Sequence, residues 1–358
     1  MVDSQKPAKE FDVVTIGSSC MDIIMHVDDI IRLNFMDRDG SERKYTAIEY
    51  STKANVVDVH YAPGGSAANI AANLSQLGFK TAYIGKLGND VNGTMCIDDM
   101  KRNGVNLDGV LRTDEDCSAV SIILITPWGR DRSILTYKGA NDRLTPQDVK
   151  YDLLKKSRAF AWTSLTTDNG IAAIEESIKV CHDNGGIVLG APSRSIISKN
   201  PEGFKKLLKH TDLLSFNEEE LESFTGEKIF TKAIEKMLAY GPRLVCVTMG
   251  SKGSIITDGQ TVVETGTFHV EVKDTTGAGD AFASGVLFGY LKGRDLQSIG
   301  KLAAALAAKE IMSPGVRIGI PHSEEELWDF IMANKVKQTS HELQPGESLD
   351  LASGVDKN

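Results

Sequence analysis

Residues 274–282, DTTGAGDAF, place two carboxylates and two threonines around a glycine turn. Apolar residues from Phe282 onward recur at helical spacing, which predicts that a helix begins near the glycines. The free N–H groups and the dipole of such a helix start bind anions, and Gly277 and Gly279 would let a phosphoryl group approach the backbone. The segment therefore has the composition of an anion site at a helix N-terminus.

Asp280 falls in the first turn of this predicted helix, and two interpretations follow. A carboxylate there can simply complement the helix dipole. It can also accept the proton of a hydroxyl group that attacks the bound anion. The segment by itself leaves both interpretations open.

A second glycine turn opens the segment PGGSAANIAANLSQLG, residues 63–78. Gly64 and Gly65 lead into an alanine-rich helix, and Asn69 is a polar residue on its otherwise apolar face. A buried amide must find a hydrogen-bond partner. A buried helix with a glycine start explains the pattern without a function, and a polyhydroxylated ligand bound to Asn69 is the functional alternative.

Asn217 and Glu220 follow a predicted strand in SFNEEELESFTG. Their spacing is that of a capping box, in which each side chain binds the backbone N–H of the other residue. The same oxygen-rich pair can hold hydrated Mg²⁺ beside nucleotide phosphates. Both interpretations stay open from the sequence.

Thr248 ends another predicted strand, and Gly250 and Gly253 form the turn that follows it in VTMGSKGS. Alone, this pattern is typical of a turn between two strands. Beside an anion site it also fits a backbone cradle for a nucleotide.

The elements that must position these residues alternate between short β-branched runs and longer helical segments. The alternation predicts an α/β fold, a doubly wound and mostly parallel sheet with helices on both faces. Ligands bind beyond the carboxyl ends of such strands, where the motifs above fall. The buried strands are predicted at 13–17, 186–190, 213–216 and 244–250.

Two segments break this alternation and predict a small separate β-sheet, a lid over the ligand end of the large one. Edge hairpins of the large sheet are the alternative. The C-terminal segment is polar without hydrophobic periodicity and is expected to be a loose tail. The predicted division is an α/β core at 11–24, 62–117 and 138–335, a lid at 25–61 and 118–137, and a tail at 336–358.

Composition narrows the class of protein. The 358 residues are 41% hydrophobic and 25% charged, as in globular proteins, and no run approaches the roughly 18 apolar residues of a membrane span. The net charge of −9 argues against nucleic acid as a partner. Five cysteines without a CxxC pair favour a reducing, cytoplasmic location. Walker, protein-kinase and GxSxG motifs are absent, and the seven histidines lack metal-binding spacing.

Together, these motifs resemble the ribokinase-type, or PfkB-type, family of carbohydrate kinases. The resemblance covers residues 11–330 approximately and rests on GGSAANIAANLSQLG with YIGKLGND after it, an NxxE segment, a TxGxxG turn and DTTGAGDAFASG, in that order. It implies transfer of the γ-phosphoryl group of ATP, with Mg²⁺, to a hydroxyl of a small sugar. By the same resemblance, Asp280 is the general base and the amides of Gly277, Ala278 and Gly279 form the anion hole.

The resemblance also implies roles for residues outside that segment. Family members bear a β-sheet lid through which they often pair, so we expect a homodimer. Ribokinases often have serine where Gly319 stands, and Gly319 offers no side-chain oxygen to a cation. The implied residues are Asp22, Gly64, Gly65 and Asn69 for substrate; Asn217, Thr248, Gly250 and Gly253 for nucleotide; Glu220 for Mg²⁺ through water; and Asp274 and Thr276, with the loop at Gly315 and Gly319, for a monovalent cation such as K⁺.

Three substrate classes compete. A free sugar such as ribose or fructose is favoured because GRDRSILTYKGANDRL resembles a segment of general sugar kinases, with Asn141 as a candidate contact. A nucleoside such as adenosine is the alternative, because the long lid resembles those of nucleoside kinases. Its base would need an aromatic shelf, for which Tyr45, Tyr50 and Tyr61 are candidates.

A sugar phosphate is the third class. It would need cations for its phosphate, and Arg130, Arg132 and Lys138 are candidates, unless they are solvated hairpin charges. A non-catalytic binding protein is the alternative of another kind. The intact Asp280 and glycine turn argue against it, because such a protein has no chemical need for the base.

Overall fold

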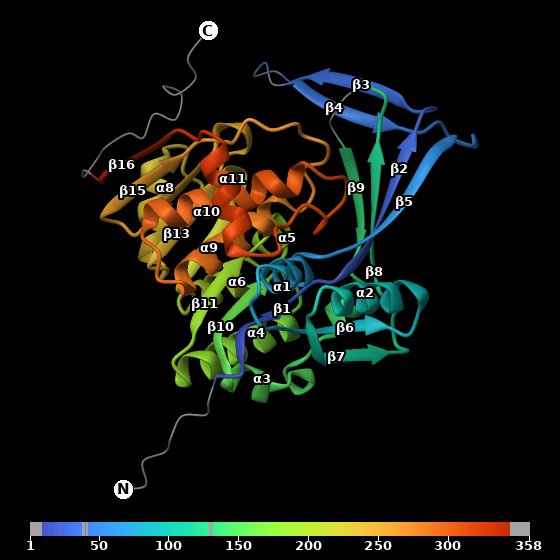
Figure 1. Cartoon of the computed structure of the whole chain (residues 1–358). Helices are drawn as coiled ribbons and strands as arrows, with labels where there is room; N and C mark the ends of the chain where they lie inside the picture. The colour runs from blue at the N-terminus through green and yellow to red at the C-terminus, as the bar shows by residue number, and fades with distance from the viewer. Residues whose placement is uncertain (1–8, 38–39, 41, 129–131, 344–358) are drawn as a thin grey trace, which may run out of the picture.

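A computed structural model describes residues 9–37, 40, 42–128 and 132–343. Its strands form a sheet of ten strands, a sheet of four and a ribbon of two. Helices cover both faces of the large sheet, and the small sheet projects from one end of it (Figure 1). This is the predicted α/β fold, a mostly parallel sheet flanked by helices with a separate small sheet.

The large sheet follows the buried β-branched runs of the sequence. Val13, Val14 and Ile16 of an interior strand, Phe11–Ile16, are fully buried, because a parallel strand covered on both faces has no solvent side. The pairing is parallel from β7 to β13 and antiparallel from β13 to β16. Across the sheet the strands are β7 (Asn106–Thr113), β6 (Thr81–Gly88), β1 (Phe11–Ile16), β10 (Ser157–Thr163), β11 (Ile187–Ala191), β12 (Leu213–Asn217), β13 (Leu244–Thr248), β14 (Ser254–Thr257), β15 (Thr261–Thr265) and β16 (Gln338–Glu342).

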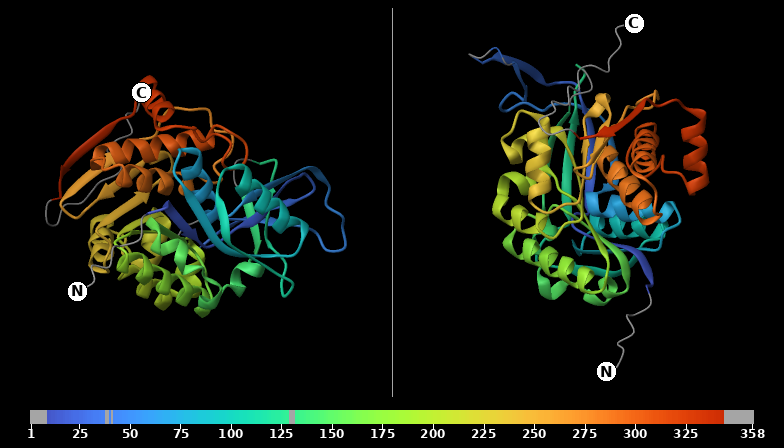
Figure 2. Two further views of the ribbon diagram at one scale, coloured as in Figure 1. Left: turned by 60° about the horizontal axis from the view of Figure 1, so that its bottom comes forward. Right: turned by 90° about the vertical axis from the view of Figure 1, so that its left-hand side faces the viewer.

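Two helical layers sandwich this sheet (Figure 2). One layer holds α1 (Ser66–Gln76), α2 (Val91–Arg102), α9 (Ala278–Leu291), α10 (Leu296–Ile311) and α11 (Glu324–Ala333). The other holds α3 (Tyr151–Lys155), α4 (Asp168–Asp183), α5 (Arg194–Lys199), α6 (Pro201–Leu208), α7 (Glu218–Thr225) and α8 (Phe230–Ala239). Among the described residues, no helix combines the length and the apolar character needed to cross a membrane.

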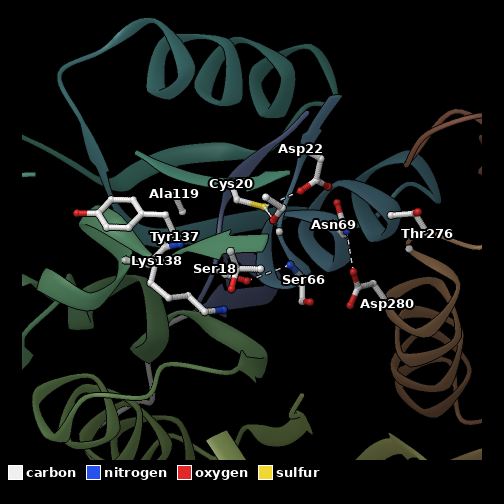
Figure 3. A pocket seen from close by; sticks show the side chains of 15 residues that line it. Ser18, Cys20, Asp22, Ser66, Asn69, Ala119, Tyr137, Lys138, Thr276 and Asp280 are labelled. Carbon is white, nitrogen blue, oxygen red and sulfur yellow. Dashed lines mark hydrogen bonds between the residues drawn. The ribbon is translucent and has the colours of Figure 1, made fainter. Parts of the chain in front are cut away.

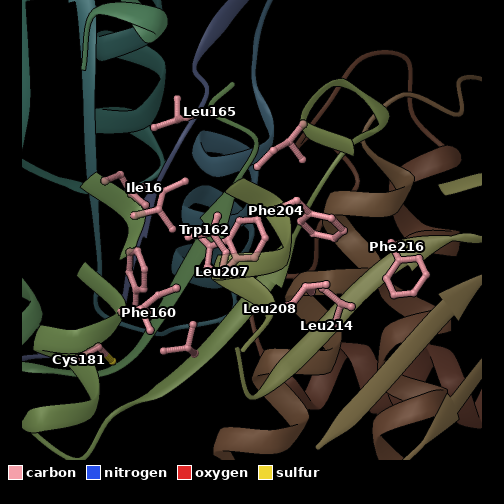
Figure 4. Packing of buried hydrophobic residues seen from close by; sticks show 14 of the residues in the cluster. Ile16, Phe160, Trp162, Leu165, Cys181, Phe204, Leu207, Leu208, Leu214 and Phe216 are labelled. Atoms are coloured by element: carbon pink, nitrogen blue, oxygen red, sulfur yellow. The ribbon is translucent and has the colours of Figure 1, made fainter. Parts of the chain in front are cut away.

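Each layer packs on the sheet through its own apolar core. In the second layer, Trp162 of β10 packs edge-on against Phe204 of α6, with ring centroids 6.3 Å apart (Figure 4). Phe204 in turn contacts Phe224 of α7 at 4.6 Å. These aromatic contacts fix α6 and α7 over the sheet. They also help to position Asn217, which ends β12 and caps the start of α7.

The C-terminal edge of the sheet corrects one prediction. Residues 336–358 are expected from their polarity to be a loose tail, yet Gln338–Glu342 forms β16, paired antiparallel with β15. Main-chain hydrogen bonds drive this pairing, and they need no apolar side chains. The prediction is therefore wrong for β16, and residues 344–358 lie outside the described part of the chain.

The small sheet has the order β5 (Val56–Gly64), β2 (Cys20–Val27), β8 (Ala119–Ile125) and β9 (Arg132–Tyr137). It is separate from the large sheet, as predicted, and its strand β2 begins before the expected lid boundary at residue 25. β3 (Ile31–Met36) and β4 (Glu42–Ala47) form the added ribbon beyond it (Figure 1). Because Asp22 lies in β2 and Gly64 ends β5, the small sheet supplies candidate substrate contacts directly.

Candidate active site

Helix α9 begins at the predicted glycine turn. Its N-cap is Gly277, whose φ of 79° lies in the left-handed region, and no side chain caps the helix. A Cβ added at Gly277 would lie 2.6 Å from Oε1 of Glu310 and 2.9 Å from Cγ1 of Val316, so conformation and space both require glycine. A Cβ added at Gly279 would meet nothing within 4 Å. The uncapped helix start therefore has room for an anion beside its backbone.

Asp280 lies in the first turn of α9 and faces Asn69 of α1 (Figure 3). The Asn69 Nδ2 group donates a hydrogen bond of 2.7 Å to Oδ2 of Asp280. Burial raises the pKa of Asp280 above its ordinary value, while the hydrogen bond from Asn69 and the charge of Arg317 oppose this rise. The buried amide that the sequence left without a partner thus binds the candidate base.

Arg317 completes this arrangement, and sequence reasoning missed it. Its side chain is buried, and its Nε donates a hydrogen bond of 2.8 Å to Oδ1 of Asn69. The one available signal was an isolated charge in the otherwise apolar loop PGVRIGIP, which says nothing about the residue that the charge contacts.

A cavity of about 200 Å³ opens in front of Asp280 (Figure 3). Its lining is largely polar and comes from β2, β8, β9, α1 and the start of α9. It brings together seven residues predicted at the site, namely Asp22, Gly65, Asn69, Asn141, Thr276, Gly277 and Asp280. Residues that the sequence did not indicate also line it, among them Ser18, Cys20, Ser66, Ser121 and Thr136.

Asp22 supplies the second buried carboxylate of this cavity, and the residue is 7% exposed. Burial raises its pKa, and the Cys20 thiol donates a hydrogen bond of 3.2 Å to its Oδ1. Gly64 does not line the cavity in the described part of the chain, but a Cβ there would lie 2.4 Å from Oδ2 of Asp22. Gly64 therefore makes space for the carboxylate.

Gly65 and Asn141 hold the cavity wall together. Gly65 has a φ of 98°, and a Cβ there would lie 2.5 Å from the Cα of Ser19. Asn141, in the 3₁₀ helix η1 (Gly139–Arg143), accepts from the N–H of Ser19 and donates to its carbonyl oxygen. Both the oxygen and the NH₂ group of the Asn141 side chain, the predicted substrate contact, are thus hydrogen-bonded to the backbone of Ser19.

A second and larger cavity, of about 850 Å³, lies on the other side of the glycine turn. Its lining includes all four predicted nucleotide residues, Asn217, Thr248, Gly250 and Gly253, together with Ala278 and Gly279. Gly250 belongs to the 3₁₀ turn η3 (Gly250–Lys252), and both Gly250 and Gly253 have positive φ. The predicted turn does join two strands, β13 and β14, and it also borders a cavity.

Glu220 acts as a helix cap in this structure. The Asn217 N–H donates to Glu220 Oε2 at 2.9 Å, and the Glu220 N–H donates to Asn217 Oδ1 at 2.8 Å, which is the predicted capping box. Glu220 is buried, and it is not among the described residues that line either cavity. Asn217, in contrast, both caps α7 and lines the large cavity.

Asp274 organises the loops around the glycine turn. Its Oδ1 accepts from the backbone N–H and the hydroxyl of Thr276, at 2.9 and 2.7 Å. Its Oδ2 accepts from the N–H of Gly315 on the returning loop, at 3.2 Å. The predicted proximity of Asp274, Thr276 and Gly315 is therefore present.

The residues considered for alternative substrates are spread out. Tyr50, in the connection between β4 and β5, is 98% exposed, and Tyr61, in β5, is 58% exposed. None of Tyr45, Tyr50 and Tyr61 belongs to the described lining of the small cavity. Lys138 does line it. Arg130 and the side chain of Arg132 lie outside the described part of the chain.

Comparison with known proteins identifies the family. Residues 11–323 match the model of the pfkB family carbohydrate kinases. An uncharacterized sugar kinase of Archaeoglobus fulgidus is 34% identical over 250 residues, or 70% of this chain and 98% of that protein. The ribokinase of Bacillus subtilis is 29% identical over 74% of this chain and 86% of its own length. The adenosine kinase structure from Sinorhizobium meliloti has a TM-score of 0.75 and 29% identity, covering 89% of this chain and 99% of that one.

The chain therefore belongs to the pfkB family of carbohydrate kinases, as predicted, and is an ATP-dependent carbohydrate kinase.

Proposed function

We propose that this enzyme transfers the γ-phosphoryl group of ATP to a hydroxyl of a small, ribose-like or fructose-like sugar. One observation carries the proposal: residues 277–280 separate the two cavities. Gly277 and Asp280 line the small polar cavity, while Ala278 and Gly279 line the large one. A sugar hydroxyl in the first and nucleotide phosphates in the second would meet at the start of α9.

In this mechanism Asp280 takes the proton of the sugar hydroxyl as the hydroxyl oxygen attacks the γ-phosphorus. The bond to the bridging oxygen breaks, and ADP leaves with the bonding electrons. The amides of residues 277–279 and the helix dipole stabilise the charge on the transferring group. Burial raises the pKa of Asp280 toward the range that suits a general base.

We infer that ATP occupies the large cavity, whose volume falls within the roughly 300–1,000 Å³ of ligand pockets. In the described part of the chain, no group of three or more His, Cys, Asp or Glu side chains is arranged to hold a metal. Mg²⁺ would then be bound mainly by phosphate oxygens and water, with Glu220 acting through water, and it would neutralise phosphate charge. We extend the proposal to a monovalent cation such as K⁺ at Asp274 and Thr276.

The small cavity supports a sugar over a nucleoside. Its volume of about 200 Å³ is below that of most drug-sized ligand pockets, and its lining is polar. The tyrosines that would form a shelf for a base do not line it in the described structure. A nucleoside stays the alternative, because the adenosine kinase noted above shares the fold at 29% identity.

A sugar phosphate is the second candidate, and Lys138 favours it. Lys138 directly follows β9, and it lines the small cavity (Figure 3). No ion pair of Lys138 occurs within the described ranges. Its ammonium group could bind a phosphate or carboxylate on the substrate.

Replacing Asp280 by asparagine tests the mechanism. The Asp280→Asn variant should lose about 10²–10⁴-fold in kcat, because it cannot accept the proton, while ATP binding measured by calorimetry stays intact. Asp295→Asn is the matched control, since Asp295 caps the start of α10 away from both cavities. If Asp280 only complemented the helix dipole, the two variants would behave alike, and the proposed mechanism would be wrong.

The substrate class is tested by coupled ADP release with ribose, fructose, fructose 6-phosphate and adenosine at equal concentration. Turnover of ribose or fructose supports the first candidate. A preference for fructose 6-phosphate over fructose supports the second, and turnover of adenosine alone would overturn both. If none of the four compounds raised ADP release above the background rate measured without an acceptor, the result would support the non-catalytic alternative.

We also propose a homodimer formed through the small sheet, in a cytoplasmic protein. Support for the dimer comes from large apolar side chains exposed on that sheet and its ribbon, such as Ile31, Phe35 and Leu135. Light scattering of the purified protein tests it, and a monomer at micromolar concentration would contradict it. The cytoplasmic location rests on the cysteine pattern alone and is tested by fractionation.

A further inference from the structure

Arg317 is a buried and conformationally constrained charged residue near the candidate base. It lies in the loop between α10 and α11, is 4% exposed, and has a φ of 71° in the left-handed region that non-glycine residues avoid. A large charged side chain persists in such a conformation only when its surroundings hold it there. Those surroundings indicate what the residue does.

Four contacts from three helices, α1, α2 and α10, hold Arg317. Its backbone N–H donates to Oε1 of Glu310 at 2.9 Å, and its carbonyl oxygen accepts from Nε2 of Gln76 at 3.0 Å. Its Nη1 forms an ion pair with Asp99 of α2. Its Nε donates to Oδ1 of Asn69 at 2.8 Å. The guanidinium group is thus fixed between α1 and α2, directly behind Asn69.

The contact with Asn69 has a chemical consequence for Asp280. An arginine side chain has donors and no acceptor, so the Asn69 amide must turn its oxygen toward Arg317. The NH₂ group of Asn69 is then left to face Asp280, to whose Oδ2 it donates at 2.7 Å. Without Arg317 the amide can flip, and its oxygen would then face the carboxylate with no proton between them.

We propose that Arg317 is a positioning residue for phosphoryl transfer, which orients Asn69 and through it the carboxylate of Asp280. Arg317 does not line either cavity in the described structure, so it acts behind the residues that would touch substrate. The inference rests on the proposed role of Asp280 as the base. It goes beyond that role because it assigns the orientation of the base to a residue on a different loop.

The charge of Arg317 contributes as well as its hydrogen bonds. Buried Asp22 and Asp280 face one cavity, and Arg317 lowers the pKa of both. Removing the cation should therefore raise the pKa of Asp280 and move the acidic limb of the pH–rate profile to higher pH. The other charged groups that act on or lie near Asp280 are Asp22, Glu220, Glu310 and Lys138.

The test uses the full chain and the sugar that turns over fastest in the panel above. Arg317→Met keeps much of the volume but removes donors and charge, and it should lower kcat about 10²-fold with little change in KM for ATP. Arg317→Lys keeps the charge and one donor and should restore part of the loss. Arg102→Met is the matched control, because Arg102 also pairs with Asp99 but is exposed. It should leave kcat unchanged.

A double-variant cycle separates positioning from a general loss of structure. If Arg317 acts through Asn69, then Arg317→Met should have almost no further effect on kcat in an Asn69→Leu background, measured above the acidic limb of the pH–rate profile so that the direct effect of the charge does not contribute. Additive losses would overturn the inference. So would an Arg317→Met variant with full kcat, provided that Asp280→Asn is inactive. An active Asp280→Asn would instead refute the proposed function.

A second measurement needs no turnover. The carboxyl ¹³C shift of Asp280, assigned by comparison with Asp280→Asn, can be titrated in the free enzyme. The titration gives the pKa of Asp280, which is compared between Arg317→Met and the unmodified chain. If the methionine variant fails to fold, Arg317→Lys takes its place. Arg317→Met should raise the pKa of Asp280, and Arg317→Lys should raise it by less. An unchanged pKa in a folded Arg317→Met, or a larger rise in Arg317→Lys than in Arg317→Met, would contradict the inference.

Discussion

The two glycines at the start of α9 should respond in opposite ways to alanine. Gly277 has a φ of 79°, and its added Cβ would lie 2.6 Å from a buried carboxylate oxygen of Glu310 and 2.9 Å from Val316. A left-handed conformation costs a non-glycine residue about 1–2 kcal/mol, and overpacking typically costs about 1–3 kcal/mol. Gly277→Ala should therefore lower the free energy of unfolding by about 2–5 kcal/mol.

Gly279→Ala is the matched replacement within the same turn of helix. Its Cβ would meet nothing within 4 Å, and alanine is a better helix former than glycine by about 1 kcal/mol. The free energy of unfolding should stay the same or rise. The new methyl group would, however, stand in the large cavity where the nucleotide phosphates are proposed to approach the backbone. We expect kcat to fall about tenfold or more, because the phosphoryl group is displaced.

Two assays distinguish these effects. Urea unfolding followed by the fluorescence of the three tryptophans gives stability, and coupled ADP release gives kcat and KM. A Gly277→Ala variant as stable as the original would refute the steric argument. A Gly279→Ala variant with unchanged kinetics would refute close approach of phosphate at that position, whatever its stability.

Two further predictions concern buried and capping residues. Glu310 is 1% exposed, and burial raises its pKa to about 7, so the folded state binds a proton that the unfolded state releases near its ordinary pKa. Stability should therefore fall by roughly 3 kcal/mol as pH rises from about 4.5 to above 7, and Glu310→Gln should flatten this part of the stability–pH curve in urea titrations. A curve that stays equally steep would contradict the assignment. Asn217→Ala should lower the free energy of unfolding by about 1 kcal/mol and raise KM for ATP, because Asn217 both caps α7 and lines the large cavity. Asp295→Ala removes a helix cap away from both cavities, so it should lower stability by about the same amount and leave KM unchanged. Equal KM effects in the two variants would place Asn217 outside the nucleotide site.

Local features of this chain were readable from its sequence because their causes are local. The start of α9 follows from a glycine turn ahead of an apolar helical repeat, and the Asn217–Glu220 capping box follows from a spacing of three residues. The buried strands follow from β-branched runs that parallel sheets require. The order of four motifs then indicated the family, and the position of each motif after a strand indicated the edge of the sheet on which the site lies.

The features that the sequence did not reveal also have a common cause, because each depends on contacts between distant segments of the chain. β16 is made by main-chain pairing with β15, so its polar side chains carry no strand signal. The functional interpretation of Asn69 expected a ligand as its partner, but the sequence could not show which side chains from distant segments approach it. Arg317 lies 248 positions away along the chain.

The sequence by itself indicated the reaction class and the residue that is proposed to act as base, because four motifs occur in the order that resembles the family and Asp280 directly follows the glycine turn of the last one. Tertiary structure decided the surroundings of that base. Packing of α1 against α9 brings Asn69 to Asp280, and the returning loop places Arg317 behind the amide. Hydrogen bonds and charges act over a few ångströms in space regardless of chain separation, so only the folded structure could reveal these partners.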